Sequence, residues 1–121
     1  MKLLLVDDDA FLRDMYAIKF EEAGHTVFVA KQSAEAISLL EGGEVFDVIL
    51  MDMVMPGITG VELLEKIKKL DLARNTKCIV LSNQGEQSDI DSATSAGAVG
   101  YIIKAESIPS QVVSRVEELA K

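Results

Sequence analysis

Short apolar runs alternate with amphipathic stretches five times along the chain. The apolar runs cover residues 3–6, 26–30, 48–51, 78–81 and 99–103. Runs of this length are typical of strands that are buried on both faces of a sheet. Because each run precedes a stretch of helical character, the pattern predicts an α/β fold with a parallel sheet and helices on both faces. The run at 26–30 alternates more than the others and predicts a less buried strand.

The first amphipathic stretch predicts a helix with Asp9 as its N-cap and Gly24 just beyond its C-terminal end. Three apolar residues recur there at helical spacing and predict the buried face, whereas Arg13 is expected in solvent. The three are Phe11, Met15 and Ile18, with Leu12 and Tyr16 beside them.

Four further helices are expected. Ser33 is the predicted N-cap of the second helix, and Gly42-Gly43 ends it. The third helix combines the pairs Glu62/Lys66 and Glu65/Lys69 with an apolar stripe. The fourth, over 87–96, is rich in poor helix formers and is predicted to be the least stable. The stripe residues are Val61, Leu64, Ile67 and Leu70 in the third helix, and Val112, Val113, Val116 and Leu119 in the fifth, which has Pro109 in its first turn.

Composition narrows the class of protein. A chain of 121 residues with 49% hydrophobic residues fits a single folded domain over residues 1–121. The net charge of −8 argues against direct nucleic-acid binding and favours metal cations or basic protein surfaces. The single cysteine, Cys78, fits a reducing, cytoplasmic location and is expected to be a buried small hydrophobe. No apolar stretch approaches the ~20 residues of a membrane span.

Polar residues stand where four of the predicted strands end. They are Asp7-Asp8-Asp9, Asp52, Ser82 and Lys104. In parallel sheets, ligands bind beyond the carboxyl ends of the strands, so these groups are expected to lie together. Clustered carboxylates repel one another, and Mg²⁺ would relieve that repulsion. A carboxylate can also be the nucleophile in phosphoryl transfer, with Lys104 neutralising charge and Ser82 donating a hydrogen bond.

Five sequence elements carry a resemblance to a known family. They are LVDDD at 5–9, DMVMPG at 52–57 with Gly60, Leu81-Ser82, AGA at 96–98 and GYIIK at 100–104. In their order and spacing the chain resembles the response-regulator receiver domains of two-component signalling. The resemblance implies a flavodoxin-like (βα)5 fold with strand order 2-1-3-4-5.

The resemblance also implies roles for individual residues. Asp52 would accept a phosphoryl group from a sensor histidine kinase or a histidine phosphotransfer protein. Asp8, Asp52 and the backbone carbonyl of Val54 would hold Mg²⁺, with Asp7 acting through water; Mn²⁺ could substitute. Because the Val54 side chain cannot hydrogen-bond water, slow self-dephosphorylation is expected.

Further residues would bind the phosphoryl group and respond to it. The backbone N–H groups of Met53 and Asn83 would contact its oxygens, and Lys104 would pair with its charge. Ser82 and Tyr101 would form the switch, although Tyr101 is equally interpreted as a half-buried strand aromatic. The surface of the fourth helix, fifth strand and fifth helix would then bind a protein effector or a separate output domain, or form a dimer.

Two departures from the family pattern keep alternatives open. Ala105 stands where proline usually follows the lysine, so the bond before it is expected to be trans, or cis and strained. Asn83 is larger than the usual residue and would narrow access to Asp52. A degenerate receiver that binds partners without phosphorylation is one alternative, and a phosphatase with an Asp7-x-Asp9 nucleophile motif is the other. His25 is interpreted as a surface residue without a role.

Overall fold

Five parallel strands form one sheet in the order β2-β1-β3-β4-β5. The computed structural model describes residues 1–121. The strands are β1 (Lys2–Val6), β2 (Thr26–Ala30), β3 (Val48–Met51), β4 (Lys77–Ser82) and β5 (Gly100–Ile103). The helices are α1 (Ala10–Glu22), α2 (Ser33–Glu41), α3 (Gly60–Lys69), α4 (Gln87–Ser95) and α5 (Pro109–Leu119), with a 3-10 turn, η1, at Lys104–Glu106.

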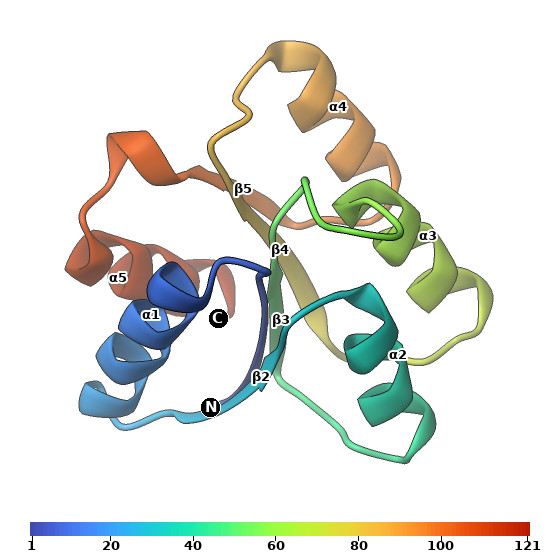
Figure 1. The fold of residues 1–121 in the computed structure, drawn as a ribbon, viewed down its shortest axis with the longest axis horizontal. Helices are drawn as coiled ribbons and strands as arrows, with labels where there is room; N and C mark the ends of the chain where they lie inside the picture. Colours follow the sequence, from blue (N-terminus) through green and yellow to red (C-terminus); the bar gives the residue numbers. More distant parts are fainter.

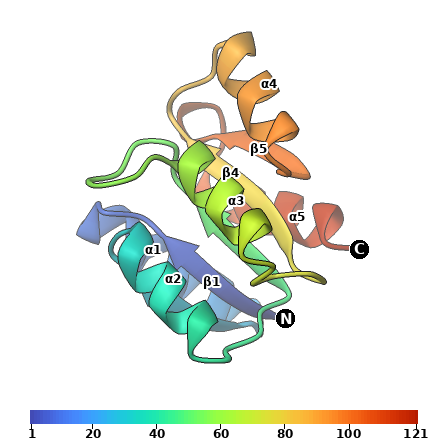
Figure 2. The ribbon, with the colours of Figure 1, turned by 90° about the vertical axis from the view of Figure 1, so that its right-hand side faces the viewer.

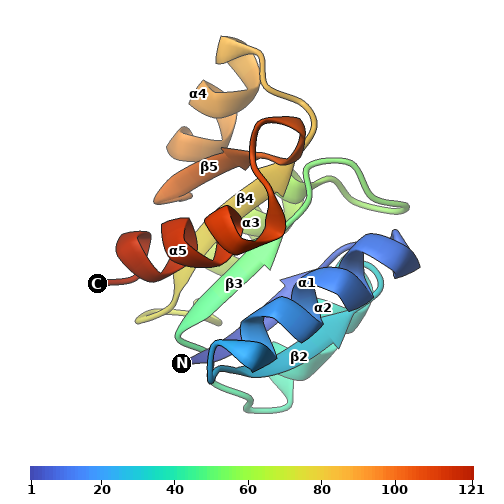
Figure 3. The same cartoon turned by 90° about the vertical axis from the view of Figure 1, so that its left-hand side faces the viewer.

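The helices cover the sheet in two layers. Helices α1 and α5 lie on one face, and α2, α3 and α4 lie on the other (Figure 1). Figure 2 views the molecule from the side of α2 and α3, and Figure 3 from the side of α1 and α5. This arrangement and strand order confirm the predicted flavodoxin-like α/β fold.

Each face of the sheet has its own hydrophobic core. Successive side chains of β1 point to opposite faces, so Leu4 and Val6 pack beneath α2, α3 and α4, whereas Leu3 and Leu5 pack beneath α1 and α5. Strands β1 and β3 lie at the centre and are almost completely buried. Edge strand β2 is partly exposed, as its alternating pattern predicts.

The buried face of α1 differs from the prediction. Phe11 is 76% exposed and Ile18 is 56% exposed. Of the other predicted residues, Tyr16 is buried, whereas Leu12 and Met15 are only partly buried. The apolar pattern of α1 is ambiguous, because the helix carries a second stripe, and this second stripe packs on Leu3 and Leu5. The buried residues are Arg13, Tyr16, Ala17 and Phe20. The predicted Asp9 cap is confirmed: its side chain accepts a hydrogen bond from the Leu12 N–H.

Helix α2 begins at Ser33, but Ser33 is not its side-chain cap. Gln32 occupies the N-cap position, and the Ser33 hydroxyl donates to the carbonyl of Ile58. Ser33 therefore ties α2 to the loop before α3, a tertiary role that a local capping pattern does not reveal.

In α3 the predicted stripe is partly wrong. Leu63, Leu64 and Ile67 are buried, whereas Leu70 is largely exposed at the helix end. Neither predicted (i, i+4) charge pair comes within ion-pair distance. Glu62 instead accepts from the Thr59 N–H in a capping box, so its side chain is turned toward the start of the helix.

Helices α4 and α5 differ in how much they bury. In α4 only Ala93 is buried. Helix α5 buries Val112, Val113 and Val116 as predicted, whereas Leu119, the last residue of the predicted stripe, is only partly buried. The low stability expected of α4 stays a prediction. None of the helices is both long and apolar enough to cross a membrane.

Candidate functional site

The polar residues that follow the strands meet at one edge of the sheet. Asp7, Asp8 and Asp9 follow β1, Asp52 follows β3, Ser82 ends β4 and Lys104 follows β5. Strands β1 and β3 are adjacent, but the chain leaves β1 toward β2 and returns to β3 on the other side. That reversal is the topological switch point where open α/β sheets bind ligands.

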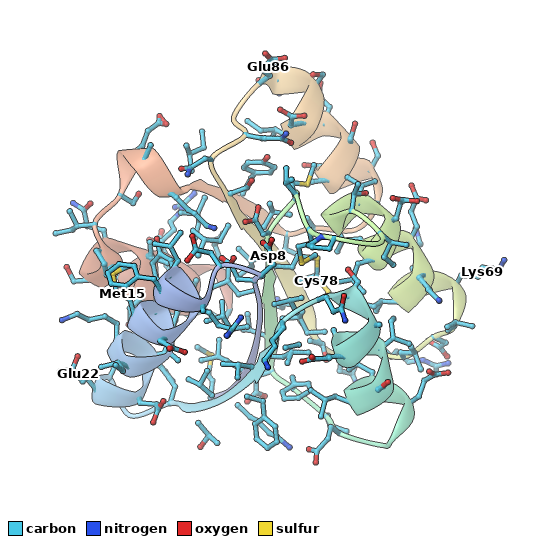
Figure 4. The ribbon with its side chains drawn as sticks, viewed as in Figure 1. Asp8, Met15, Glu22, Lys69, Cys78 and Glu86 are labelled. Atoms are coloured by element: carbon cyan, nitrogen blue, oxygen red, sulfur yellow. The ribbon has the colours of Figure 1, made fainter.

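Three carboxylates form an acidic cluster there. One oxygen each from Asp7, Asp8 and Asp52 lie within 4.8 Å of one another. Asp7 is buried, Asp52 is partly exposed and Asp8 is open to solvent; Figure 4 shows Asp8 above the carboxyl ends of the central strands. These oxygen donors range from buried to open to solvent. They suit a divalent cation such as Mg²⁺, because Mg²⁺ prefers oxygen ligands and keeps several bound waters.

Lys104 bridges two members of this cluster. Its Nζ donates to Asp7 Oδ2 at 2.8 Å and to Asp52 Oδ2 at 2.9 Å, and its side chain is only 7% exposed. Burial by itself disfavours the ammonium charge, but the hydrogen bonds to Asp7 and Asp52 outweigh it, so the pKa of Lys104 is raised. Lys104 therefore remains charged next to both carboxylates.

Asp7 has both oxygens engaged within the protein. Oδ1 accepts from the Asp9 N–H at 2.9 Å, and Oδ2 accepts from Lys104. Asp52 is held by its neighbours as well, because Oδ1 accepts from the Val54 N–H at 3.2 Å and Oδ2 accepts from Lys104. The Asp8 carboxylate forms no hydrogen bond or ion pair with the protein. Asp8 is thus the freest carboxylate of the three.

Two buried side chains of α1 bear on the cluster, and the sequence analysis assigned neither of them to the site. Arg13, expected in solvent, is buried and donates from Nη1 to the backbone carbonyl of Asp7 at 3.0 Å. The pKa of the Tyr16 hydroxyl is raised, chiefly because the group is buried. The charge of Lys104 partly offsets this rise, and the charge of Asp7 adds to it. An arginine on an amphipathic helix gives no sequence signal of burial, because arginine is usually exposed.

Ser82 and Tyr101 are linked through the backbone of Gln84. The buried Ser82 hydroxyl accepts from the Gln84 N–H at 3.3 Å, and the Tyr101 hydroxyl donates to the Gln84 carbonyl. The Tyr101 ring packs partly against the core beneath α2, α3 and α4. Burial raises the pKa of Tyr101, as do the charges of Asp89 and Asp52, while the nearby Ser82 hydroxyl lowers it.

The remaining predicted residues surround Asp52. The backbone N–H groups of Met53 and Asn83 donate no hydrogen bond within the protein. The Val54 side chain is exposed beside the acidic cluster. The bond between Lys104 and Ala105 is trans, as are all others, and it begins the turn η1.

His25 corrects the prediction that it lies unused at the surface. Its side chain is 10% exposed, with Nε2 at 2.8 Å from Glu117 Oε2 and Nδ1 at 3.0 Å from the backbone nitrogen of Met1. His25 thus joins the start of β2 to α5. It is not a member of the acidic cluster, which consists of three aspartates. Cys78 is buried as predicted, and burial raises its pKa to about 11.

Comparison with known proteins gives a consistent result. The family model described as the response regulator receiver domain matches residues 3–117. The phosphate regulon transcriptional regulatory protein PhoB of Pseudomonas aeruginosa is 31% identical over 119 residues, which are 98% of this chain and 51% of PhoB. The chemotaxis protein CheY of Thermotoga maritima is 34% identical over 125 residues, covering 99% of this chain and 98% of CheY.

Solved structures agree with these relatives. A CheY-like receiver domain protein from Methanospirillum hungatei superposes with a TM-score of 0.88 at 29% identity, covering 98% of this chain and 92% of that chain. A Francisella receiver domain gives a TM-score of 0.87 at 30% identity, with 98% and 95% covered. The chain spans about half the length of PhoB and of the transcriptional regulatory protein ResD of Bacillus subtilis, 51% and 48% respectively. This chain belongs to the response regulator receiver domains of two-component systems.

Proposed function

We propose that this receiver accepts a phosphoryl group on Asp52 from the phosphohistidine of a sensor histidine kinase or a histidine phosphotransfer protein, in a Mg²⁺-dependent reaction. The observation that supports this best is the placement of Lys104. Its Nζ donates to both Asp7 and Asp52 beside a cluster of three carboxylates. Such a site holds a nucleophile, a fixed cation and an excess of negative charge that a divalent ion would balance.

The chain's own residues can carry the transfer. A carboxylate oxygen of Asp52 attacks the phosphorus, the phosphorus–nitrogen bond breaks, and the departing histidine nitrogen keeps the electron pair. Lys104, already 2.9 Å from Asp52 Oδ2, then pairs with a phosphoryl oxygen. The free N–H groups of Met53 and Asn83 and the hydroxyl of Ser82 are available to the other oxygens.

The donor set fits Mg²⁺, with Mn²⁺ as a substitute. Asp8, Asp52 and the carbonyl of Val54 would hold the ion directly. Asp7 would act through water, because its carboxylate is buried, whereas that of Asp52 is partly exposed. When bound, Mg²⁺ would neutralise charge on the phosphoryl oxygens. The open position of Asp8 supports this division of roles.

Phosphorylation would change a surface formed by α4, β5 and α5. Ser82 connects to Tyr101 through Gln84, so movement of Ser82 toward the phosphoryl group would alter the contact that holds Tyr101 in β5. Helix α4 buries only Ala93 and offers little resistance to re-packing. The altered face would bind a downstream effector or an output domain, or a second copy of the chain.

The test is incubation with Mg²⁺ and a small phosphodonor such as acetyl phosphate, followed by intact-mass measurement. Wild type is expected to gain one phosphoryl group, Asp52→Asn none, and the matched control Asp9→Asn as much as wild type. An undiminished gain in Asp52→Asn would overturn the assignment, and attachment at Asp7 would favour a phosphatase. No gain in wild type would favour a receiver that acts without phosphorylation.

Decay of the adduct should be slow, because the side chain of Val54 cannot form a hydrogen bond with an attacking water.

A further inference from the structure

Arg13 is an unusual residue to find beneath this site. It is 8% exposed, and an arginine remains charged at any ordinary pH. Its hydrogen bond goes to the neutral carbonyl of Asp7, and it forms no ion pair with a carboxylate. Burying a charged group without an opposite charge is costly, and an apolar side chain of similar size would generally serve stability better. A role other than filling space therefore fits Arg13 best.

The contact lies at a specific place in the acidic loop. The carbonyl of Asp7 belongs to the peptide group that precedes Asp8, and Arg13 Nη1 holds it at 3.0 Å. The next peptide group, which carries the Asp9 N–H, is held by Asp7 Oδ1 at 2.9 Å. Both peptide planes that flank Asp8 are thus fixed, one of them by Arg13.

Asp8 depends on this backbone more than its neighbours do. Asp7 and Asp52 have side chains that are held by Lys104 and by backbone N–H groups. The Asp8 carboxylate has no such partner, so its place beside Asp7 and Asp52 follows from the orientation of its backbone. A change in the Asp7 peptide plane would move the Asp8 oxygens out of the cluster.

We propose that Arg13 is a positioning residue for the acidic cluster: by holding the Asp7 carbonyl it orients Asp8 and so sets the affinity of the site for Mg²⁺. This inference rests on the proposed function, since it assumes that the cluster binds Mg²⁺. Helix α1 would then contribute to the site as well as to packing, because Arg13 contacts the loop that precedes the helix.

The experiment compares Mg²⁺ dissociation constants, measured by calorimetric titration, with unfolding free energies measured in EDTA. Arg13→Met keeps the apolar stem but removes the donors, and it should weaken Mg²⁺ binding about tenfold or more, as loss of a partner that orients a ligand usually does. Arg13→Lys restores one charged donor and should bind Mg²⁺ more tightly than Arg13→Met. Hydrogen exchange at the Asp9 amide, whose N–H donates to Asp7 Oδ1, should accelerate in Arg13→Met when measured in EDTA.

Phe20→Leu is the matched control, because Phe20 lies on the same buried face of α1 but near the other end of the helix, beside His25. It should lower the unfolding free energy and leave the Mg²⁺ dissociation constant within about twofold of wild type. If Arg13→Met does not fold, Arg13→Gln replaces it, since its shorter amide also loses the contact.

Two outcomes would overturn the inference alone. One is an Arg13→Met protein whose Mg²⁺ dissociation constant stays within about twofold of wild type, which would leave Arg13 a purely structural role. The other is an equal loss of affinity in Phe20→Leu, which would make the effect a general consequence of instability. Absence of Mg²⁺ binding by wild type would instead overturn the proposed function, and this inference with it.

Discussion

At the scale of single residues, the site depends on a few close backbone approaches as much as on charged side chains. Gly60, the first residue of α3, donates its N–H to the carbonyl of Met53 and so closes the loop that begins at Asp52. A Cβ at Gly60 would lie 2.4 Å from the Asp52 carbonyl oxygen and 2.9 Å from Met53 Cα. Both are backbone atoms: one belongs to Asp52 of the acidic cluster, and the other to the residue that follows it.

Gly60→Ala should therefore lower the unfolding free energy by about 1–3 kcal/mol, the usual cost of overpacking, although alanine is the better helix former. Gly100→Ala is the control, because its Cβ would meet the Cδ1 of Leu119, a side-chain atom that can move. Urea unfolding of both variants tests this. Equal destabilisation by the two substitutions would contradict the backbone clash.

The buried thiol of Cys78 predicts a pH dependence. Burial raises its pKa to about 11 from an ordinary value of 9.0, so the unfolded chain loses this proton at lower pH than the folded protein does. The stabilising contribution is complete below pH 9 and is lost as the pH rises toward 11. Unfolding free energies across this interval should fall by about 2 kcal/mol more in wild type than in Cys78→Ala. Parallel curves for the two proteins would count against the shift.

At the scale of elements, α4 stands apart from its neighbours. It buries only Ala93, whereas α3 buries Gly60, Leu63, Leu64 and Ile67. Full burial of a large aliphatic side chain contributes about 1.5–3 kcal/mol, so α4 is anchored much more weakly than α3. An element held this loosely can change its packing without disturbing the sheet, which is what a switch requires.

Amide hydrogen exchange should show α4 at least about tenfold less protected than α3, a difference of 1.4 kcal/mol in local opening. Ser92→Ala serves as a control, since Ser92 is exposed and alanine has the higher helix propensity. This variant should slow exchange in α4 and leave α3 unchanged. Equal protection of the two helices in wild type would count against the proposed role of α4.

At the scale of the whole molecule, electrostatic repulsion among the carboxylates of the acidic cluster opposes the pairing of strands β1 and β3. Three carboxylates meet one ammonium group there, in a chain whose net charge is −8. Repulsion among these groups opposes folding, so the site is built at some expense of stability. A bound cation would remove that opposition and bind only the folded form, because the three aspartates come together only when β1 and β3 pair.

Mg²⁺ should therefore stabilise the protein by mass action, by about 2.7 kcal/mol at a concentration one hundred times its dissociation constant. Thermal unfolding in Mg²⁺ and in NaCl of equal ionic strength would measure this. Asp8→Asn should lose most of the gain specific to Mg²⁺, while Asp9→Asn should keep it. A gain of equal size in NaCl would reduce the effect to screening of charge.

The alternation of strands and helices could be predicted from the amino-acid sequence, since apolar runs and helical periodicity are local properties. The sequence also determined which polar groups stand at the strand ends, and its resemblance to receiver domains supplied the strand order that the structure confirms. Tertiary structure alone decided which face of α1 is buried, because two apolar stripes compete there and only docking on Leu3 and Leu5 selects one. It likewise decided that Arg13 contacts Asp7 and that His25 pairs with Glu117, because both contacts depend on how separate elements pack together rather than on a local pattern.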